Sequence, residues 1–179
     1  MSNIGHFVSL ARFNAKHYLK WAEFSFHVCK FKVVNSALVD STRVFLYNAR
    51  DGDYINASFV SIPDVPSRKY ILTQGPMQQT VNHFWLMVWE RQCPAIIMLN
   101  RFIEKGSLRC HPYFPHNGGS SVLKLSDVGL IVELEEETNT KLFIQRKFNI
   151  TNTEVRRLKI TREKVVNRVI FSQISRSPS

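Results

Sequence analysis

The order of apolar and polar residues predicts two short β-strands near the start of the folded domain. Residues 54–62 have the aromatic and β-branched composition of a strand, and a turn at residues 50–53 leads into it. Residues 69–73 have the same character and are followed by Gly75 and Pro76, which end a strand. We therefore expect two strands in this stretch.

An amphipathic helix is predicted next. Four apolar residues have the i, i+3, i+4, i+7 spacing of one helix face. Thr80 stands where a residue caps the first turn, and Pro94 ends the helix. Residues 95–99 then form an unbroken apolar run, which is typical of a strand buried on both faces. The four apolar residues of the helix are Val81, Phe84, Trp85 and Val88.

The following stretch predicts a β-meander. Its three segments of strand composition are residues 122–125, 130–134 and 141–150. Residues 135–140 form the predicted last turn, because an acidic run is typical of a solvated turn. That run consists of Glu133, Glu135, Glu136 and Glu137. The predicted fold class is therefore α/β, with a β-meander near residues 121–150.

Both ends of the chain differ from this domain. Residues 1–31 are rich in aromatic residues and contain no acid before Glu23, so we expect a basic arm, helical, that packs on the domain or stays loose. Such a start also makes mitochondrial import a minor alternative. The net charge of +10 is uneven, because residues 146–179 hold 9 basic and 2 acidic residues. We expect a solvated basic tail, with nucleic-acid binding as the alternative.

Composition excludes several classes of protein. The chain has 179 residues, 44% of them hydrophobic, so it can bury a core and does not read as disordered. Its unbroken apolar runs, such as residues 95–99, are far too short to cross a bilayer. Three cysteines without framework spacing indicate reduced thiols and a cytoplasmic protein.

Simple motifs assign no active site. Cys110, His111 and His116 are close in sequence, but no second ligand pair stands at zinc spacing, so a core thiol and structural histidines are expected. The chain has no Gly-x-Ser-x-Gly elbow, no Walker loop and no Gly-x-Gly-x-x-Gly. We therefore predict no metal, no cofactor and no catalytic residue.

A series of short strings carries more information. In chain order they are Asp53-Tyr54-Ile55-Asn56-Ala57-Ser58, Tyr70-Ile71-Leu72-Thr73-Gln74-Gly75-Pro76, His83-Phe84-Trp85, Met87-Val88-Trp89-Glu90, Met98-Leu99-Asn100-Arg101, Glu104-Lys105-Gly106, Arg109-Cys110 and Tyr113-Phe114-Pro115. The series resembles the catalytic domain of protein-tyrosine phosphatases, above all the small non-receptor, T-cell-type subfamily. The resemblance is good over residues 38–115 and fades through Leu158. It implies a twisted mixed sheet flanked by helices, in whose scaffold Asn56 bonds the backbone and does no chemistry.

The chemistry of that family needs groups outside these strings. Phosphotyrosine is hydrolysed through a cysteinyl-phosphate: a thiolate in a glycine loop attacks, an arginine holds the phosphate, and an aspartic acid protonates the leaving phenolate. In the family, the cysteine and arginine lie in the motif His-Cys-x-x-Gly-x-x-Arg and the aspartic acid lies in Trp-Pro-Asp. The 179 residues contain neither motif. At the third position after Cys29, Cys93 and Cys110 stand Lys32, Ile96 and Tyr113. The chain as given is therefore predicted to be truncated before the catalytic loops and inactive.

The substrate-recognition loop also departs from the family. Its Lys-Asn-Arg-Tyr-Arg-Asp corresponds to Lys30, Phe31, Lys32, Val33, Val34 and Asn35. Val33 replaces the tyrosine that stacks on the substrate ring, and Asn35 replaces the aspartate that holds the peptide backbone. No substrate-binding residue is carried over.

The expected organisation is an arm over residues 1–31, a partial phosphatase-like domain over 32–158 and a divergent basic tail over 159–179. Three functions stay open: a truncated phosphatase domain, a pseudophosphatase or protein-binding module, and a basic nucleic-acid-binding domain. Phosphotyrosine proteins are the partners that the family resemblance implies, and no other feature of the sequence indicates them. We do not expect the chain to bind nucleic acid. In the family, the strand leading into the cysteine loop lies inside the sheet. Without it, residues 95–99 are expected to have an unpaired edge and to favour self-association.

Overall fold

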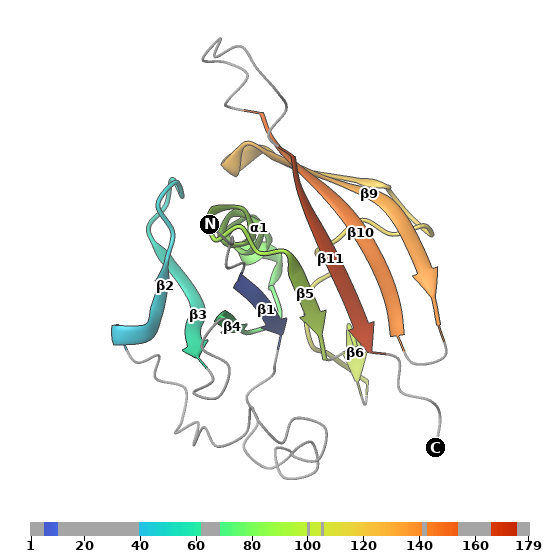
Figure 1. Cartoon of the computed structure of the whole chain (residues 1–179), viewed down its shortest axis with the longest axis horizontal. Helices are drawn as coiled ribbons and strands as arrows, with labels where there is room; N and C mark the ends of the chain where they lie inside the picture. The colour runs from blue at the N-terminus through green and yellow to red at the C-terminus, as the bar shows by residue number, and fades with distance from the viewer. Residues whose placement is uncertain are drawn as a thin grey trace.

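A long twisted sheet with one helix against it dominates the structure (Figure 1). The computed structural model describes residues 6–10, 40–61, 69–99, 101–104, 106–140, 143–153 and 166–174. Within them, nine strands form the sheet in the order β2-β3-β4-β1-β5-β11-β10-β9-β8, and β6 and β7 form a separate hairpin.

The strands and helices have the following bounds. The strands are β1 (His6–Leu10), β2 (Arg43–Phe45), β3 (Tyr54–Ser61), β4 (Lys69–Thr73), β5 (Ala95–Met98), β6 (Ile103–Glu104), β7 (Ser107–Leu108), β8 (Val122–Leu125), β9 (Leu130–Asn139), β10 (Phe143–Asn152) and β11 (Val166–Ile174). The helix α1 spans Val81–Glu90, and short 3-10 turns are η2 (Asp40–Thr42), η3 (Gln78–Thr80) and η4 (Ser126–Val128). In the part of the chain that the structure describes, no helix is long and apolar enough to cross a membrane.

The sheet is mixed, with its parallel part in the middle. β1 runs parallel to both β4 and β5, and β5 runs parallel to β11. The pairs on either side of this centre are antiparallel. The predicted α/β class with a mixed sheet is confirmed, although the described residues contribute a single α-helix to it.

The predicted meander is present as β8, β9 and β10, but one of its turns is placed wrongly in the prediction. β9 continues to Asn139, so the acidic run lies in a strand and not in a turn. The cause is the facing strand, where Lys147 is the register partner of Glu136 and forms an ion pair with it. Opposite charges across two strands stabilise the pairing that the acidic run alone does not favour.

The expected unpaired edge at residues 95–99 is wrong. β5 has a parallel partner on each side, with Ala95 facing Phe7 of β1 and Ile170 of β11. The ends of the sheet are instead β2 and β8, both very short, which limits the open edge that a second sheet could join.

The strand β11 lies in the segment that we expected to be a solvated tail. Val169 and Phe171 are 1% and 0% exposed. Arg168, which precedes them, and Ile170, which lies between them, are exposed. This alternation with period two marks a half-buried strand. A search for an amphipathic helix does not detect this strand, because it looks for apolar residues that recur every 3.6 residues.

The N-terminal arm also differs from its prediction. Residues 6–10 form a strand in the middle of the sheet and not a helix. The physical reason is the pairing itself, since two flanking parallel strands supply hydrogen-bond partners that outweigh local preference. The remainder of the predicted arm, including Trp21 and Phe24, lies outside the described residues.

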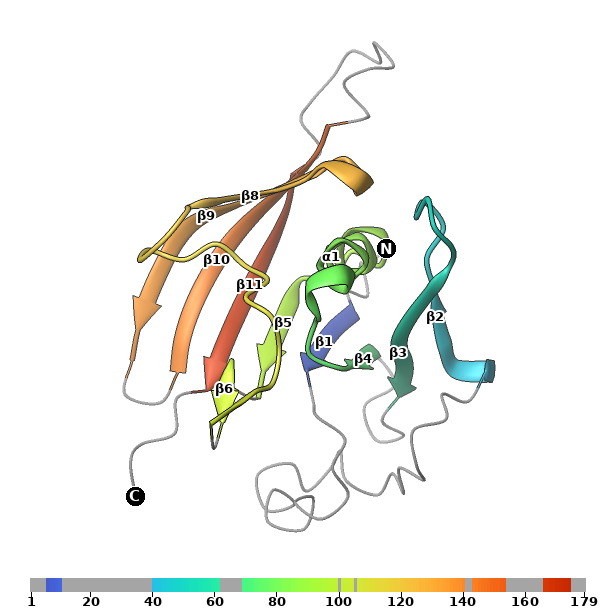
Figure 2. The same ribbon diagram turned by 180° about the vertical axis from the view of Figure 1, so that it is seen from behind.

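The helix α1 covers the middle of one face of the sheet (Figures 1 and 2). Trp85 is fully buried, and its ring meets Phe148 of β10 edge to face. Thr80 occupies the N-cap position but makes no capping bond, because its hydroxyl bonds backward to the main chain of Met77. Figure 2 shows the chain after β7 crossing in front of β10 and β11, and Phe114 packs there on Phe171.

Candidate functional site

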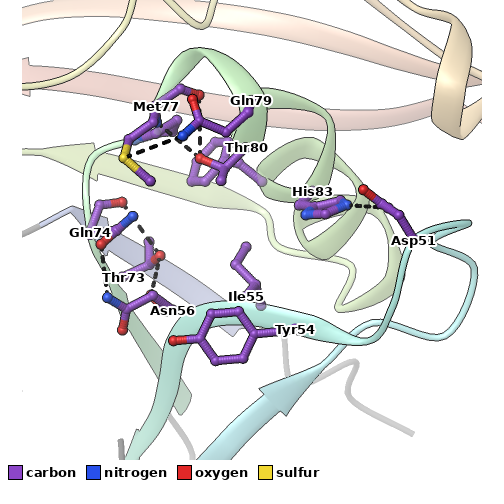
Figure 3. A pocket seen from close by; sticks show the side chains of 12 residues that line it. Asp51, Tyr54, Ile55, Asn56, Thr73, Gln74, Met77, Gln79, Thr80 and His83 are labelled. Carbon is purple, nitrogen blue, oxygen red and sulfur yellow. Dashed lines mark hydrogen bonds and ion pairs between the residues drawn. The ribbon is translucent and has the colours of Figure 1, made fainter. Parts of the chain in front are cut away.

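A pocket lies where β3, the connection from β4 and the start of α1 meet, and most of its lining residues belong to the family-like strings (Figure 3). Its volume is about 330 Å³. Ile55 and Phe84 are buried side chains of its wall, and Tyr54 is an exposed member of the lining. The remaining lining residues are Asp51, Asn56, Thr73, Gln74, Pro76, Met77, Gln79, Thr80 and His83.

An acid–histidine pair stands at one end of this pocket (Figure 3). Asp51 belongs to the turn before β3, and its Oδ1 lies 2.9 Å from Nε2 of His83 in the first turn of α1. The hydrogen bond from His83 lowers the pKa of Asp51 below its usual value. A lowered carboxyl pKa means that the pair stabilises the fold above the ordinary pKa of aspartate and that this contribution is lost as the pH falls through the lowered pKa.

The side-chain amides of Asn56 and Gln74 form a hydrogen-bonded pair at the other end of the pocket. Asn56 Nδ2 donates to Oε1 of Gln74 at 2.8 Å, and the Thr73 hydroxyl donates to the backbone oxygen of Asn56 at 2.9 Å. The side chain of Asn56 therefore contacts another side chain and not the backbone, which corrects our expectation for it. These bonds tie β3 to the end of β4, so the role of Asn56 is structural.

The pocket offers binding groups but no cysteine nucleophile. Its hydroxyls at Thr73 and Thr80 are already engaged with main-chain groups. No cysteine lines it, and the imidazole of His83 faces a carboxylate and not a hydroxyl or thiol. The cysteinyl intermediate of the phosphatase family needs a thiol, so this pocket can hold a ligand but does not supply that nucleophile.

The two cysteines that the structure describes are buried thiols. Cys93 is 2% exposed, and burial raises its pKa to about 12, although nearby Arg91 opposes the shift. It follows the C-terminal end of α1, where the helix dipole disfavours a negative sulfur. Cys110 is 3% exposed and lies so close to Gly75 that a Cβ there would stand 2.6 Å from the cysteine Cβ. Burial therefore disfavours the thiolate form of Cys93, and Cys110 is enclosed in the core.

The metal candidates of the sequence do not gather. Among the described residues, no three histidine, cysteine or acidic side chains form a group that would hold a metal ion. Cys110 is buried in the core, whereas the His116 ring accepts a hydrogen bond from the backbone of Gly118. The predicted recognition loop, residues 30–35, and Cys29 lie outside the described residues.

A buried arginine is a feature that the sequence patterns missed. Arg146 of β10 is 6% exposed, donates to Glu137 at 2.6 Å and to Gln173 at 3.1 Å, and lies 4.9 Å above the Phe114 ring. A charge is tolerated in the core only when it is paired in this way. The signal that could have found it is its alternation with Phe148 and Ile150, which share its face of the strand.

Tyr113 is the centre of the aromatic core and has an unusual polar end. Its ring contacts Phe84, Phe102, Phe114 and Phe171, and its carbonyl accepts the indole N–H of Trp85 at 2.6 Å. Its hydroxyl is fully buried and has no hydrogen-bond partner among the described residues. Burial raises the pKa of Tyr113 well above its ordinary value, so the hydroxyl stays protonated.

Replacing Tyr113 by phenylalanine is expected to leave the free energy of unfolding unchanged or to raise it by about 1 kcal/mol, because an unpaired buried hydroxyl contributes only its desolvation cost. Urea unfolding of the two proteins measures the difference. The matched control is Thr73→Val, which removes a buried hydroxyl that does donate to a carbonyl and is expected to cost about 1–2 kcal/mol. A loss for Tyr113→Phe as large as that of the control would contradict the assignment.

Comparison with known proteins agrees with this architecture. The family described as "Protein-tyrosine phosphatase" matches residues 27–172. Tyrosine-protein phosphatase non-receptor type 61F of Drosophila melanogaster is 47% identical over 103 residues, which cover 57% of this chain and 19% of the relative. The human non-receptor type 2 enzyme is 47% identical over 98 residues, covering 55% and 23%. Human receptor-type tyrosine-protein phosphatase alpha is 35% identical over 136 residues, covering 72% and 16%.

The chain belongs to the protein-tyrosine phosphatase family, and its similarity to non-receptor members confirms the resemblance seen in its short strings. The match continues past Leu158, where we expected the resemblance to fade, and includes most of β11. The chain spans about a fifth of the length of the first relatives it matches.

Proposed function

We propose that these 179 residues form a phosphatase-family scaffold that does not hydrolyse phosphotyrosine. The observation that carries the proposal is the burial of both described thiols, Cys93 and Cys110. A cysteinyl-phosphate requires a thiolate near neutral pH, held by backbone N–H groups at a helix N-terminus. Cys93 has a pKa of about 12 at the other end of a helix, and Cys110 is enclosed in the core. These residues do not contain the cysteine-loop motif of the family, and in this proposal the chain is truncated before that loop.

The purified chain is accordingly expected to show no turnover of a small aryl phosphate. Release of the phenol is followed by absorbance, beside a mock purification from cells without the gene. The variants Cys93→Ser and Cys110→Ser, checked for folding by circular dichroism, are expected to leave any background rate unchanged. A rate that is well above the mock sample and is abolished by vanadate would contradict the proposal.

A protein-binding role is the second candidate, and the completeness of the sheet favours it. Because β5 has partners on both sides, the scaffold does not depend on a further strand at that position. The pocket beside His83 adds a surface that can hold a ligand without chemistry. As family members act on phosphotyrosine proteins, such proteins are the first partners to test. We place this role in the cytoplasm, as reduced Cys93 and Cys110 and the non-receptor relatives support.

Binding separates this candidate from the truncated enzyme and from a nucleic-acid binder. Saturable binding of a tyrosine peptide would favour the protein-binding role over a truncated enzyme without a partner. We expect the phosphorylated and unphosphorylated peptides to bind alike, because Val33 stands where the family has a substrate-stacking tyrosine. Salt-dependent binding of an oligonucleotide would instead favour the nucleic-acid alternative. Part of the basic excess is already neutralised, since Arg146 and Lys147 pair with Glu137 and Glu136.

A further inference from the structure

The strand β1 fills a slot whose two walls are separate parts of the sheet. On one side it pairs in parallel with all five residues of β4, from His6 opposite Lys69 to Leu10 opposite Thr73. On the other side Phe7 to Leu10 pair with Ala95 to Met98 of β5. In the described residues, β1 is the strand that joins the β2-β3-β4 part of the sheet to the β5-β11-β10-β9-β8 part.

The slot requires a strand, because its walls lie in the core. Ile71 and Thr73 of β4 are 0% and 2% exposed, and Ile96 and Met98 of β5 are 0% exposed. Without a strand between them, the inward backbone N–H and C=O groups of both walls would lack partners in a buried place, which proteins avoid. The occupant must also run parallel to both walls, so an antiparallel strand does not reproduce the observed register.

The covalent connection does not dictate which copy of β1 fills the slot. Residues 11–39 separate β1 from η2, and an extended segment of that length reaches up to about 100 Å. In the sheet, β1 lies three strand spacings from β2, a distance of about 14 Å. The connection is therefore long enough for the β1 of one molecule to enter the slot of a neighbouring molecule.

We propose that β1 exchanges between two copies of this chain, which gives a reciprocal dimer in which each sheet is completed by residues 6–10 of the other copy. Every pairing of β1 with β4 and β5 is the same in the monomer and in the dimer. The balance between the two forms is then set by the protein concentration and by the effective concentration that the connection imposes. The occupant is a second copy because its β1 already has the direction and register that the slot demands.

A cross-linking experiment between two full-length variants tests the exchange. One variant carries Ser9→Cys and one purification tag, and the other carries Ile97→Cys and a different tag. Ser9 and Ile97 are register partners across the slot. The two are unfolded together, refolded at high concentration and treated with a short thiol–thiol cross-linker. We expect a covalent heterodimer that both tags recover, together with a dimer mass by light scattering whose share grows with concentration.

The matched control mixes Ser9→Cys with Lys124→Cys. Lys124 is exposed on β8, at the far end of the sheet from β1, so strand exchange brings no cysteine near it. We expect ~10-fold less heterodimer in this mixture, because a reciprocal exchange joins specific positions. A mixture of two unsubstituted chains measures the background from Cys29, Cys93 and Cys110.

The outcomes decide clearly. A heterodimer specific to Ser9 and Ile97 supports the exchange. A monomer at every concentration, with cross-links only inside a chain that carries both substitutions, overturns it. Equal cross-linking with Lys124→Cys shows non-specific association and overturns it as well. If Ile97→Cys does not fold, Leu72→Cys gives the same test from the other wall, because Leu72 is the partner of Ser9 on β4.

Discussion

Replacing Val8 by proline is expected to lower the free energy of unfolding by on the order of 3 kcal/mol. Val8 is the middle residue of β1 and pairs with Ile71 on one side and Ile96 on the other. Proline removes the N–H that one wall of the slot requires and leaves a buried carbonyl without a donor. Such a loss is a large part of the stability of an ordinary domain. Urea unfolding followed by fluorescence or circular dichroism measures the change.

The variant Val8→Ala separates the backbone effect from the loss of the side chain, because it keeps the amide N–H. It is expected to be clearly more stable than Val8→Pro. Equal stability of Val8→Pro and the unsubstituted chain would mean that residues 6–10 do not stand in the sheet. That result would also remove the basis for strand exchange while leaving the catalytic proposal untouched.

Truncating Trp85 to alanine is expected to cost about 3–5 kcal/mol. Its side chain is fully buried between Phe84 and Phe148, whose rings it meets edge to face. Alanine leaves a cavity that the surrounding rings cannot close, and the Tyr113 carbonyl loses its indole donor. A drop in the urea midpoint with an unchanged slope is the expected observation.

Trp89→Ala is the matched control on the same helix. Trp89 is only half-buried at the margin of the core, so its truncation is expected to cost less than half as much as that of Trp85. Trp85 and Trp89 lie one turn apart on the same side of the helix, so the comparison measures how burial changes along α1. Equal costs for the two variants would contradict the deep burial of Trp85 relative to Trp89.

Much of the fold could be predicted where local pattern decides structure. The strand β4 and the strand β8 have the predicted bounds, and β3 ends one residue before its prediction. The strands β1 and β11 could not be predicted in this way. Each is held by partners far away in the sequence, and a chain read residue by residue gives no sign of that pairing.

The candidate site was less accessible to sequence reasoning. Some of its residues, such as Asn56 and His83, lie in the family-like strings, but the sequence analysis predicted no site there. The contact between Asp51 and His83 exists only because the turn before β3 folds against α1. The buried position of Arg146 ran against the rule that charges lie outside, and it depends on Glu137 and Gln173 from two neighbouring strands. That these 179 residues contain no His-Cys-x-x-Gly-x-x-Arg string can be read from the sequence alone, because a motif search needs no tertiary information.

The order of strands in the sheet has a consequence for how the molecule folds. Ala95 at the start of β5 pairs with Phe7, near the first residue of the sequence, and with Ile170, near the last. Contacts of such long sequence separation slow folding, since long loops must close before the pairing stabilises anything. During synthesis on the ribosome, β5 emerges long before β11 does. The centre of the sheet therefore forms late, and chaperones that bind exposed apolar strands have a long interval in which to act on the nascent chain.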